Sequence, residues 1–556
     1  MKKMKKAVAF LALASVLSTT ALGFVGCGKK VANDENTLEI FVSNFGYGTE
    51  WLNDMIVEFK NQDWVKEKYP NLNIPKPASN SERTYPADRM ITNGKTNTYD
   101  LLFACDSAIA YYDRKDSSGN PFFEDLTEVY NTKIPGEDLT VAQKMDETIL
   151  ANMLHTGKDG GQGYYAMPWV NGYMGLLYNQ TLVNRHLGED YQLPKTTVQL
   201  EKMAADLKAK NVTPFLSSAS HAGYWNQVCF TWWVQYEGTE AYEDYWLGVD
   251  KYDETTSENF KQLGRLRSLQ TLESLIHADK GYNHEDVNTL QFTAAQSKYI
   301  LGEAVMMPNG DWFENEMRAN YAEDKNHYDV RFMTMPVISS IVENMQLYTH
   351  GDKAYTDLTD AEKAAYDEKL AAIIAVVDAE GTLADAQVAV PELTQKDFDK
   401  VNEARRIVYG VENHEGYIPA YATAKEVAKD FLLFMASDVA CESFMRTTNG
   451  ASTAFQYDVK TKAPDLYAEF STLQKERAVI AERGITPFSA STSRLCYLGG
   501  LSYYTISNSV ESFFSSQNAK DRKSAEYIYN NDIEYYINKN NGEYWEDLLK
   551  RAGIIN

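Results

Sequence analysis

The feature that most constrains this chain is an apolar run without a charged residue, from residue 163 to residue 179, which reads GYYAMPWVNGYMGLLYN. Side chains of this kind are buried on both faces, as they are in the central strands of a sheet. Pro168 lacks the amide hydrogen that a strand ladder requires, and Gly172 tolerates a sharp change of direction. The run therefore predicts two short strands, between which the chain passes from one lobe of the molecule to another.

An α/β unit opens the folded part of the chain. Residues 37–42 read TLEIFV and predict a strand. A helix is expected after them, because apolar side chains recur at helical spacing at Trp51, Leu52, Met55, Ile56 and Phe59. In open α/β sheets, ligands meet the loops at the carboxyl ends of the strands. The loop between these two elements therefore places Asn44 and Tyr47 at a binding cleft.

Two more strands are predicted in the same lobe, at residues 71–75 and 99–104, and the second ends beside Asp106. The carboxyl-end argument puts Asp106 at the same cleft, where its carboxylate could accept hydrogen bonds from two sugar hydroxyls. The alternative is that Asp106 only caps the helix that follows.

The most specific motif is QSKYILGEAVMMPNGDW, residues 296–312. A helix that stops at Gly302 and a short strand after it would bring Asn309, Asp311 and Trp312 to the cleft. Aromatic rings stack on the apolar faces of sugars, while amides and carboxylates bind sugar hydroxyls. The alternative for Trp312 is a structural role in the core, where large aromatic side chains are common.

This motif, together with Met167-Pro168, residues 175–179, Pro194-Lys-Thr196 and the helical text AKEVAKDFLLFMASDVACESFM at residues 424–445, follows a recognisable order along the chain. It resembles the family 1 extracellular solute-binding proteins of bacterial ABC transporters. The resemblance runs from about residue 37 to residue 455.

The resemblance implies an α/β, two-lobe fold of the periplasmic-binding-protein type (type II), with a central cleft between the lobes. It also implies that Trp312 stacks on bound sugar. The positions expected to contact ligand are Asn44, Tyr47, Asp106, Trp169, Asn171, Trp225, Asn309, Asp311, Trp312 and Asn449. The lobes are expected to combine residues 37–168 with 409–455 (lobe 1) and residues 169–337 with 456–556 (lobe 2).

Residues 338–408 depart from the family pattern. Thr359 with Glu362 forms a capping-box sequence, and Thr394 can cap a second helix, so a helical hairpin inserted near the hinge is expected. This insertion could be a lid, a surface for a partner or an inert addition.

The N-terminus carries an export signal. Four lysines within residues 1–6 precede the uncharged run 7–26 and then Cys27, which predicts a signal peptide over residues 1–26. Phe24-Val-Gly-Cys27 resembles a bacterial lipobox, which implies acylation of Cys27 and a lipidated tether over residues 27–36. Acyl chains hold a protein on a membrane while its body stays in water. The alternative is a single uncleaved membrane anchor.

The net charge and the cysteine content restrict the kinds of ligand and partner that the protein can bind. A formal net charge of −24 disfavours nucleic acid and anionic lipid surfaces. The other cysteines are isolated in the sequence: Cys105, Cys229, Cys441 and Cys496. Their spacing is not that of metal ligands, and isolated cysteines are typically buried thiols. The alternative is that two of them form one disulfide between distant positions. No metal or cofactor is expected.

The sequence therefore predicts a surface lipoprotein on the extracytoplasmic face of the cell membrane, a monomer. It would bind a neutral oligosaccharide and deliver it to the permease subunits of an ABC importer. No reaction is expected. Two alternatives stay open: a glycoside hydrolase that uses two of the many carboxylates, and a binder of peptides or other polar solutes on the same fold.

Overall fold

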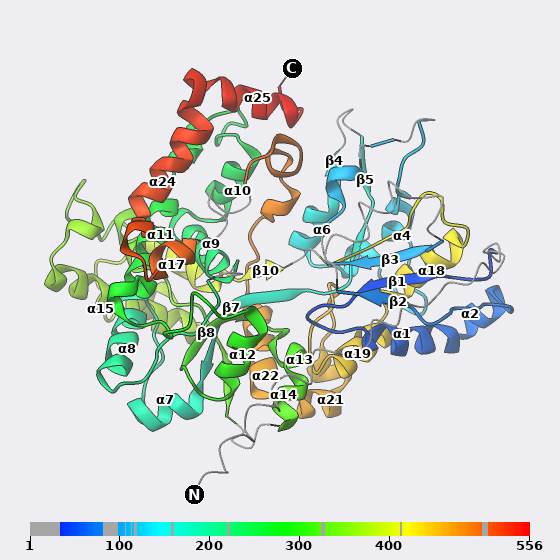
Figure 1. The fold of residues 1–556 in the computed structure, drawn as a ribbon, viewed down its shortest axis with the longest axis horizontal. Helices are drawn as coiled ribbons and strands as arrows, with labels where there is room; N and C mark the ends of the chain where they lie inside the picture. Colours follow the sequence, from blue (N-terminus) through cyan, green and yellow to red (C-terminus); the bar gives the residue numbers. More distant parts are fainter. Residues whose placement is uncertain are drawn as a thin grey trace, which may run out of the picture.

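The computed structural model describes residues 34–81, 98–105, 107–112, 114–115, 119–156, 161–219, 223–323, 328–411, 414–502 and 510–555. Two β-sheets, each covered by helices, lie side by side (Figure 1). The signal peptide, Cys27 and Asp106 lie outside the described residues, so the predictions made for them stay predictions. None of the described helices combines the length and the apolarity that crossing a membrane requires.

The first sheet has five strands, in the order β2 (Ala78–Asn80), β1 (Ile40–Ser43), β3 (Leu101–Ala104), β11 (Glu415–Tyr417) and β6 (Met167–Pro168). β1 runs parallel to β2 and β3, and β11 runs antiparallel to β3 and β6. The strand predicted at residues 71–75 is wrong, because Asn73 forms only a single bridge there, with Thr37. Pro75 and Pro77 lack amide hydrogens, so a regular ladder starts only at Ala78.

Helices cover the first sheet. The predicted helix after β1 is α1 (Glu50–Asn61), and all five residues of its apolar stripe are buried. α1 packs against α18 (Lys425–Met435) and α19 (Asp438–Thr447), and α18 packs against α4 (Thr127–Asn131). The lobe is completed by α2 (Asp63–Lys68), α5 (Val141–Lys144), α6 (Glu147–Met153) and the hairpin of β4 (Leu154–Thr156) with β5 (Gln162–Tyr164).

The second sheet is built on β7 (Gly172–Asn179), which is buried along its whole length. β10 (Tyr409–Val411), β8 (Met306–Gly310) and β9 (Val330–Met333) all pair with it in antiparallel orientation. The register places Leu177 opposite Met307 on one neighbour and Phe332 on the other. This strand is the second half of the charge-free run, which explains why that run tolerates no charge.

The chain crosses between the sheets where the sequence predicted. β6 belongs to the first sheet and β7 to the second, so residues 169–171 form one crossing, and the two predicted strands are confirmed. β10 belongs to the second sheet and β11 to the first, which makes a second crossing. The two lobes are therefore assembled from separate chain segments, while the domain boundaries proposed above remain a prediction.

Helices also cover the second sheet. The Trp-rich run that follows residue 223 forms α9 (Tyr224–Glu237), which packs against α11 (Leu263–Ile276) and against β7. Residues 212–216 do not form a regular strand; Phe215 makes single bridges to Asn283 and Met306. The remaining helices are α7 (Gln180–Leu187), α8 (Thr197–Ala209), α10 (Thr239–Leu247), α12 (Phe292–Ile300), α13 (Phe313–Glu316), α14 (Arg318–Glu323), α20 (Val459–Lys462), α21 (Pro464–Glu469), α22 (Thr472–Arg483), α23 (Val510–Ser515), α24 (Ala525–Ile533) and α25 (Glu543–Arg551).

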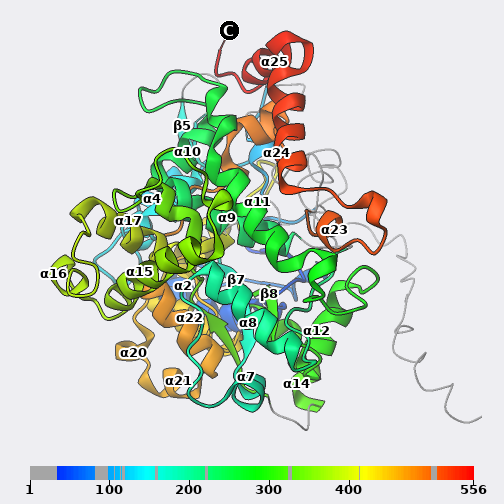
Figure 2. The same ribbon diagram turned by 90° about the vertical axis from the view of Figure 1, so that its left-hand side faces the viewer.

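Two packed helices occupy the region that departs from the family pattern. α15 (Asp360–Asp378) begins with the predicted capping box of Thr359 and Glu362, and α17 (Gln395–Arg406) is capped by Thr394. The short α16 (Leu383–Ala386) lies between them. Figure 2 shows this group at one edge of the molecule and α23 at the other. The helices are confirmed, while their status as an insertion stays a prediction.

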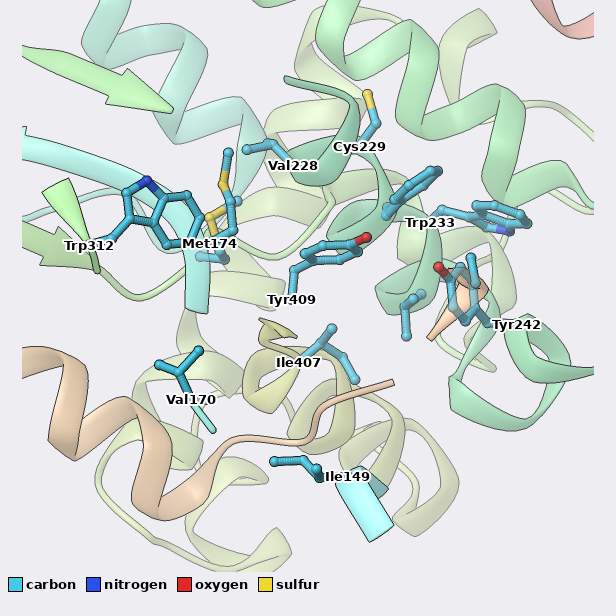
Figure 3. Close-up of a cluster of buried hydrophobic side chains, with 14 of the residues drawn as sticks. Ile149, Val170, Met174, Val228, Cys229, Trp233, Tyr242, Trp312, Ile407 and Tyr409 are labelled. Carbon is cyan, nitrogen blue, oxygen red and sulfur yellow. The ribbon is translucent and has the colours of Figure 1, made fainter. Parts of the chain in front are cut away.

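A continuous apolar core joins the lobes at the crossings. Ile149 and Val170 belong to the same buried cluster as Met174 of β7 and Tyr409 of β10 (Figure 3). All four described cysteines are free thiols: Cys105, Cys229 and Cys441 are buried, and Cys496 is half-buried.

Candidate ligand-binding site

The loops after β1 and β8 meet between the two sheets. The Tyr47 hydroxyl donates a hydrogen bond to Oδ1 of Asp311 over 2.8 Å, and both side chains are buried. Tyr47 follows β1 in the first sheet, and Asp311 directly follows β8 in the second. The carboxyl-end argument therefore correctly brings these two loops together.

Arg477 of α22 completes a buried polar cluster around Asp311. Its Nε donates to Oδ2 of Asp311 over 3.0 Å, and its terminal nitrogens donate to the Ser452 hydroxyl and the Asn171 carbonyl. The guanidinium also lies over the Tyr173 ring, 4.4 Å from its centre. Each of its three nitrogens donates one hydrogen bond and the side chain is only 2% exposed, so it is not available to bind an acidic ligand.

Burial dominates the electrostatics of this cluster. Removal from water raises the pKa of Asp311, and the charge of Arg477 opposes that rise. The pKa of the Tyr47 hydroxyl is raised well above its ordinary value by burial and by the neighbouring carboxylate. Tyr47 thus stays a neutral donor, and the cluster acts as a joint between the lobes.

Trp312 lies beside this joint in a space made by glycines. A Cβ atom at Gly310 would lie 2.2 Å from the indole ring, and Gly46 and Gly172 also border the side chain. The indole contacts Tyr47 at 6.5 Å between ring centres and Tyr224 at 6.1 Å. Only 7% of Trp312 is exposed in this conformation.

An aromatic wall extends from Trp312. The centre of the Tyr224 ring lies 6.1 Å from that of Trp312 and 5.3 Å from that of Phe292. A small hollow next to this wall is lined by Ser217, Ser218, Tyr224, Phe292, Ala295, Met307, Pro308 and Asn309. The hollow has a volume of about 10 Å³, enough for about one water molecule in this conformation, and its walls present ring faces together with hydroxyl and amide groups.

Two of the predicted asparagines lie at the surface. Asn44 is exposed, and its backbone N–H donates to the Asn80 carbonyl over 2.8 Å. Asn449 is exposed in a left-handed conformation with φ of 55°, and its side-chain amide donates to Oε2 of Glu314 over 3.5 Å. Asn449 and Glu314 come from different parts of the chain, so Asn449 lies at another contact between segments.

Three other predicted site residues, Trp169, Trp225 and Asn309, are buried, and Asn171 is half-buried. Trp169 stacks on Trp51, with ring centres 4.5 Å apart and planes 17° apart, inside the core of the first lobe. Trp225 is fully buried, and its Nε1 donates to the Ser217 hydroxyl over 3.2 Å. The side-chain amide of Asn171 donates to the Tyr173 hydroxyl over 3.1 Å. Asn309 is one of the residues that line the hollow. These side chains build the walls of the site, and ligand would not reach the indoles of Trp169 and Trp225 in this conformation.

Three residues of the site were missed in the sequence: Tyr224, Arg477 and Glu511. Tyr224 begins the same run as Trp225, but the start and phase of α9 decide which of the two faces the hollow. Glu511 accepts a hydrogen bond from the Ser217 hydroxyl, and burial raises its pKa to about 8. Arg477 and Glu511 lie far along the chain from their partners, where no local pattern could have found them.

The described part of the chain offers no metal centre: no group of three His, Cys, Asp or Glu side chains there could hold an ion.

Two helix-covered sheets, joined by crossing strands with loops that meet between them, define the fold of an extracellular binding protein. A model of the bacterial extracellular solute-binding protein family matches residues 87–440, and the chain belongs to this family. Membership confirms a solute-binding protein rather than an enzyme. No curated protein matches the chain.

Solved structures share the fold. A chitin oligosaccharide binding protein is 15% identical with a TM-score of 0.53, and the match covers 90% of this chain and 98% of that chain. Maltose-bound MalE3 of T. maritima is 14% identical with a TM-score of 0.52, over 93% of this chain and 99% of that one. The GacH receptor of Streptomyces glaucescens is 12% identical with a TM-score of 0.54, over 93% and 99%. At these identities the likeness establishes the fold alone.

Proposed function

We propose that this protein captures a neutral oligosaccharide outside the membrane and delivers it to the permease of an ABC importer. One observation carries the choice of ligand: aromatic rings gather where the loops of the two sheets meet, while the cation beside them, Arg477, is buried and paired with Asp311. An acidic ligand would need a free cation, whereas a sugar needs ring faces and neutral hydrogen-bonding groups.

The proposed contacts divide by chemistry. Trp312 and Tyr224 stack on the apolar faces of sugar rings, and Asn44 and Asn449, both at the surface of lobe 1, bind hydroxyls. Asp106 is added because it follows β3, whose carboxyl end lies in the same sheet as that of β1. These groups are held in place by the half-buried Asn171 and by the buried side chains Tyr47, Trp169, Trp225, Asn309 and Asp311.

Binding is proposed to close the lobes about the two crossings. In this proposal lobe 1 is residues 37–168 with 409–455, lobe 2 is residues 169–337 with 456–556, and residues 338–408 are an insertion near the hinge. Hinge closure around a ligand requires that the ligand bind the closed state more tightly than the open one. The permease would then distinguish the loaded protein by its shape.

The solved relatives agree with this choice of ligand class. They include the chitin oligosaccharide binding protein, the maltose-bound MalE3, GacH in complex with acarbose, and AcbH, which is described as preferring β-D-galactopyranose. The same proposal places the protein on the extracytoplasmic face, held by a lipid on Cys27. Metabolic labelling with an alkyne palmitate analogue tests the anchor, since Cys27→Ala should remain unlabelled and leave the membrane fraction.

The ligand is tested by a thermal-shift screen of residues 28–556 against neutral, acidic and amino oligosaccharides, with product analysis of each hit. Saturation at 100 times the dissociation constant adds about 2.7 kcal/mol to the free energy of unfolding. An intact neutral sugar should raise the melting temperature, and Tyr224→Ala should reduce that shift while Tyr252→Ala, at a 71% exposed tyrosine elsewhere, keeps it. Degraded sugar would indicate a hydrolase, and a response only to peptides would move the assignment to another polar solute.

A further inference from the structure

A second cavity lies away from the candidate ligand site. It has a volume of about 640 Å³ and is walled by β7, β9, α15, α17 and α22. It shares no residue with the aromatic wall or the hollow described above. Pockets of 300–1,000 Å³ are typical of small-molecule sites, so this cavity is large enough for a bound molecule.

The inner surface of the cavity is apolar. Met174 comes from β7, and the other apolar side chains come from the surrounding strands, helices and loops: Phe332, Met333, Met335, Val377, Phe398, Ile407 and Val408. All are buried. Met174 and Ile407 both belong to the buried cluster shown in Figure 3. Covering the part of this surface that water still reaches with a hydrocarbon chain or ring would be favourable.

Charged side chains gather around the cavity. Arg405 binds both carboxylate oxygens of Asp378, at 2.7 and 3.0 Å, and also the Met335 carbonyl at 2.9 Å. Arg483 is paired with Glu380. The acids Asp378 and Glu380 are therefore both occupied by arginines.

Arg406 is the remaining cation. It is exposed, and its Nε donates to the Arg483 carbonyl over 2.7 Å. Among the residues that the structure describes, Arg406 has no acidic partner, and its two terminal nitrogens have no acceptor. One unpaired guanidinium thus borders an apolar cavity in a protein whose formal net charge is −24.

We propose that this cavity is a second binding site, for an amphipathic organic anion. The apolar chain or ring of the ligand would fill the space between β9 and α17, and its single carboxylate or sulfonate would bind the guanidinium of Arg406. A guanidinium presents two parallel N–H donors to such a group, which gives both strength and orientation.

The site is tested with 8-anilinonaphthalene-1-sulfonate, whose fluorescence rises in apolar surroundings. One equivalent should bind the wild-type protein, and Arg406→Gln should weaken binding about tenfold, as expected for loss of a charge-assisted hydrogen bond. Arg551→Gln, at an exposed arginine near the C-terminus, is the matched control and should bind as the wild type does. Equal affinity in Arg406→Gln and the wild type would overturn the assignment of an anion.

A competition experiment separates the contributions of the anionic group and of the apolar chain to binding in the cavity. Octanoate should displace the probe at a concentration about tenfold lower than octanol does, and Arg406→Gln should erase this preference. Asn402→Trp places a ring in the cavity and should abolish probe binding without lowering the melting temperature by more than a few degrees. Probe binding that survives in a folded Asn402→Trp protein would show that the probe lies elsewhere and would overturn the proposal.

Discussion

The Tyr47 hydroxyl and the Asp311 carboxylate form a 2.8 Å hydrogen bond that joins the loop after β1 to the loop after β8. The two residues are 264 positions apart and belong to different sheets. Because both groups are buried, neither finds water as a substitute when its partner is removed. This bond therefore couples the conformation of the two lobes to the stability of the protein.

Tyr47→Phe should lower the free energy of unfolding by about 1–3 kcal/mol, because Asp311 loses a buried donor. Urea denaturation followed by circular dichroism measures this loss. Tyr252→Phe removes an exposed hydroxyl and should leave the unfolding midpoint unchanged. Equal midpoints for Tyr47→Phe and the wild type would show that the bond does not hold the lobes together in solution.

Arg477→Gln should lower the free energy of unfolding more than Tyr47→Phe does, by about 3–5 kcal/mol, because it leaves the Asp311 carboxylate buried without its cation. Adding Asp311→Asn to this variant should recover part of the stability, since the unpaired charge is then gone. The comparison of single and double variants by thermal unfolding measures the coupling. If the losses of stability in Arg477→Gln and Asp311→Asn add up to the loss in the double variant, the two side chains do not stabilise the protein through their ion pair.

The free energy of unfolding should fall as the pH rises from about 4.5 to about 8, because Glu511 is protonated in the folded protein over this range. Its pKa is about 8 in the folded protein, above the ordinary value of 4.5, so the folded state holds a proton that the unfolded state releases. The resulting loss of stability is about 1.4 kcal/mol for each pH unit between the two values, and it is complete above pH 8.

Glu511→Gln should remove this part of the pH dependence. Its melting temperature relative to the wild type should therefore be higher at pH 8.5 than at pH 5. Glu285→Gln, at an exposed glutamate, should show the same pH profile as the wild type. A Glu511→Gln profile that runs parallel to the wild type would mean that this carboxyl group is already ionised in the folded protein.

Gly310→Ala should weaken sugar binding, because the added methyl group would lie 2.2 Å from the Trp312 ring and force the indole to move. Gly119→Ala is the control: its Cβ would meet no atom within 4 Å, and its φ of 86° adds only backbone strain. Calorimetric titration with the sugar found in the screen measures both variants. Unchanged affinity in a folded Gly310→Ala protein would exclude Trp312 from ligand contact.

Local patterns predicted much of the architecture. The charge-free run at residues 163–179 predicted the crossing from β6 to β7, and the stripe of α1 is buried as its spacing required. The predicted caps at Thr359 and Thr394 also form. These features depend on residues close together in the chain, so the sequence alone determines them.

Other caps and contacts needed the tertiary structure. Thr423 lies just before α18 without capping it: its hydroxyl and N–H and the N–H of Ala424 all donate to Oδ1 of Asp100. Asp100 also accepts from the backbone N–H of Glu39 beside β1, so one buried carboxylate joins three segments. A long-range acceptor of this kind leaves no periodic signal near the helix that it caps.

The sequence by itself determined the α/β class, the crossing strands, the family and the loops that carry Tyr47, Asp311 and Trp312. Only the tertiary structure decided that Tyr224 rather than Trp225 faces the hollow, that Arg477 neutralises Asp311, and that a cavity lies beside Arg406. The physical reason is that strands and caps arise from neighbouring residues, whereas the phase of a helix against a sheet and the pairing of buried charges depend on how distant segments pack.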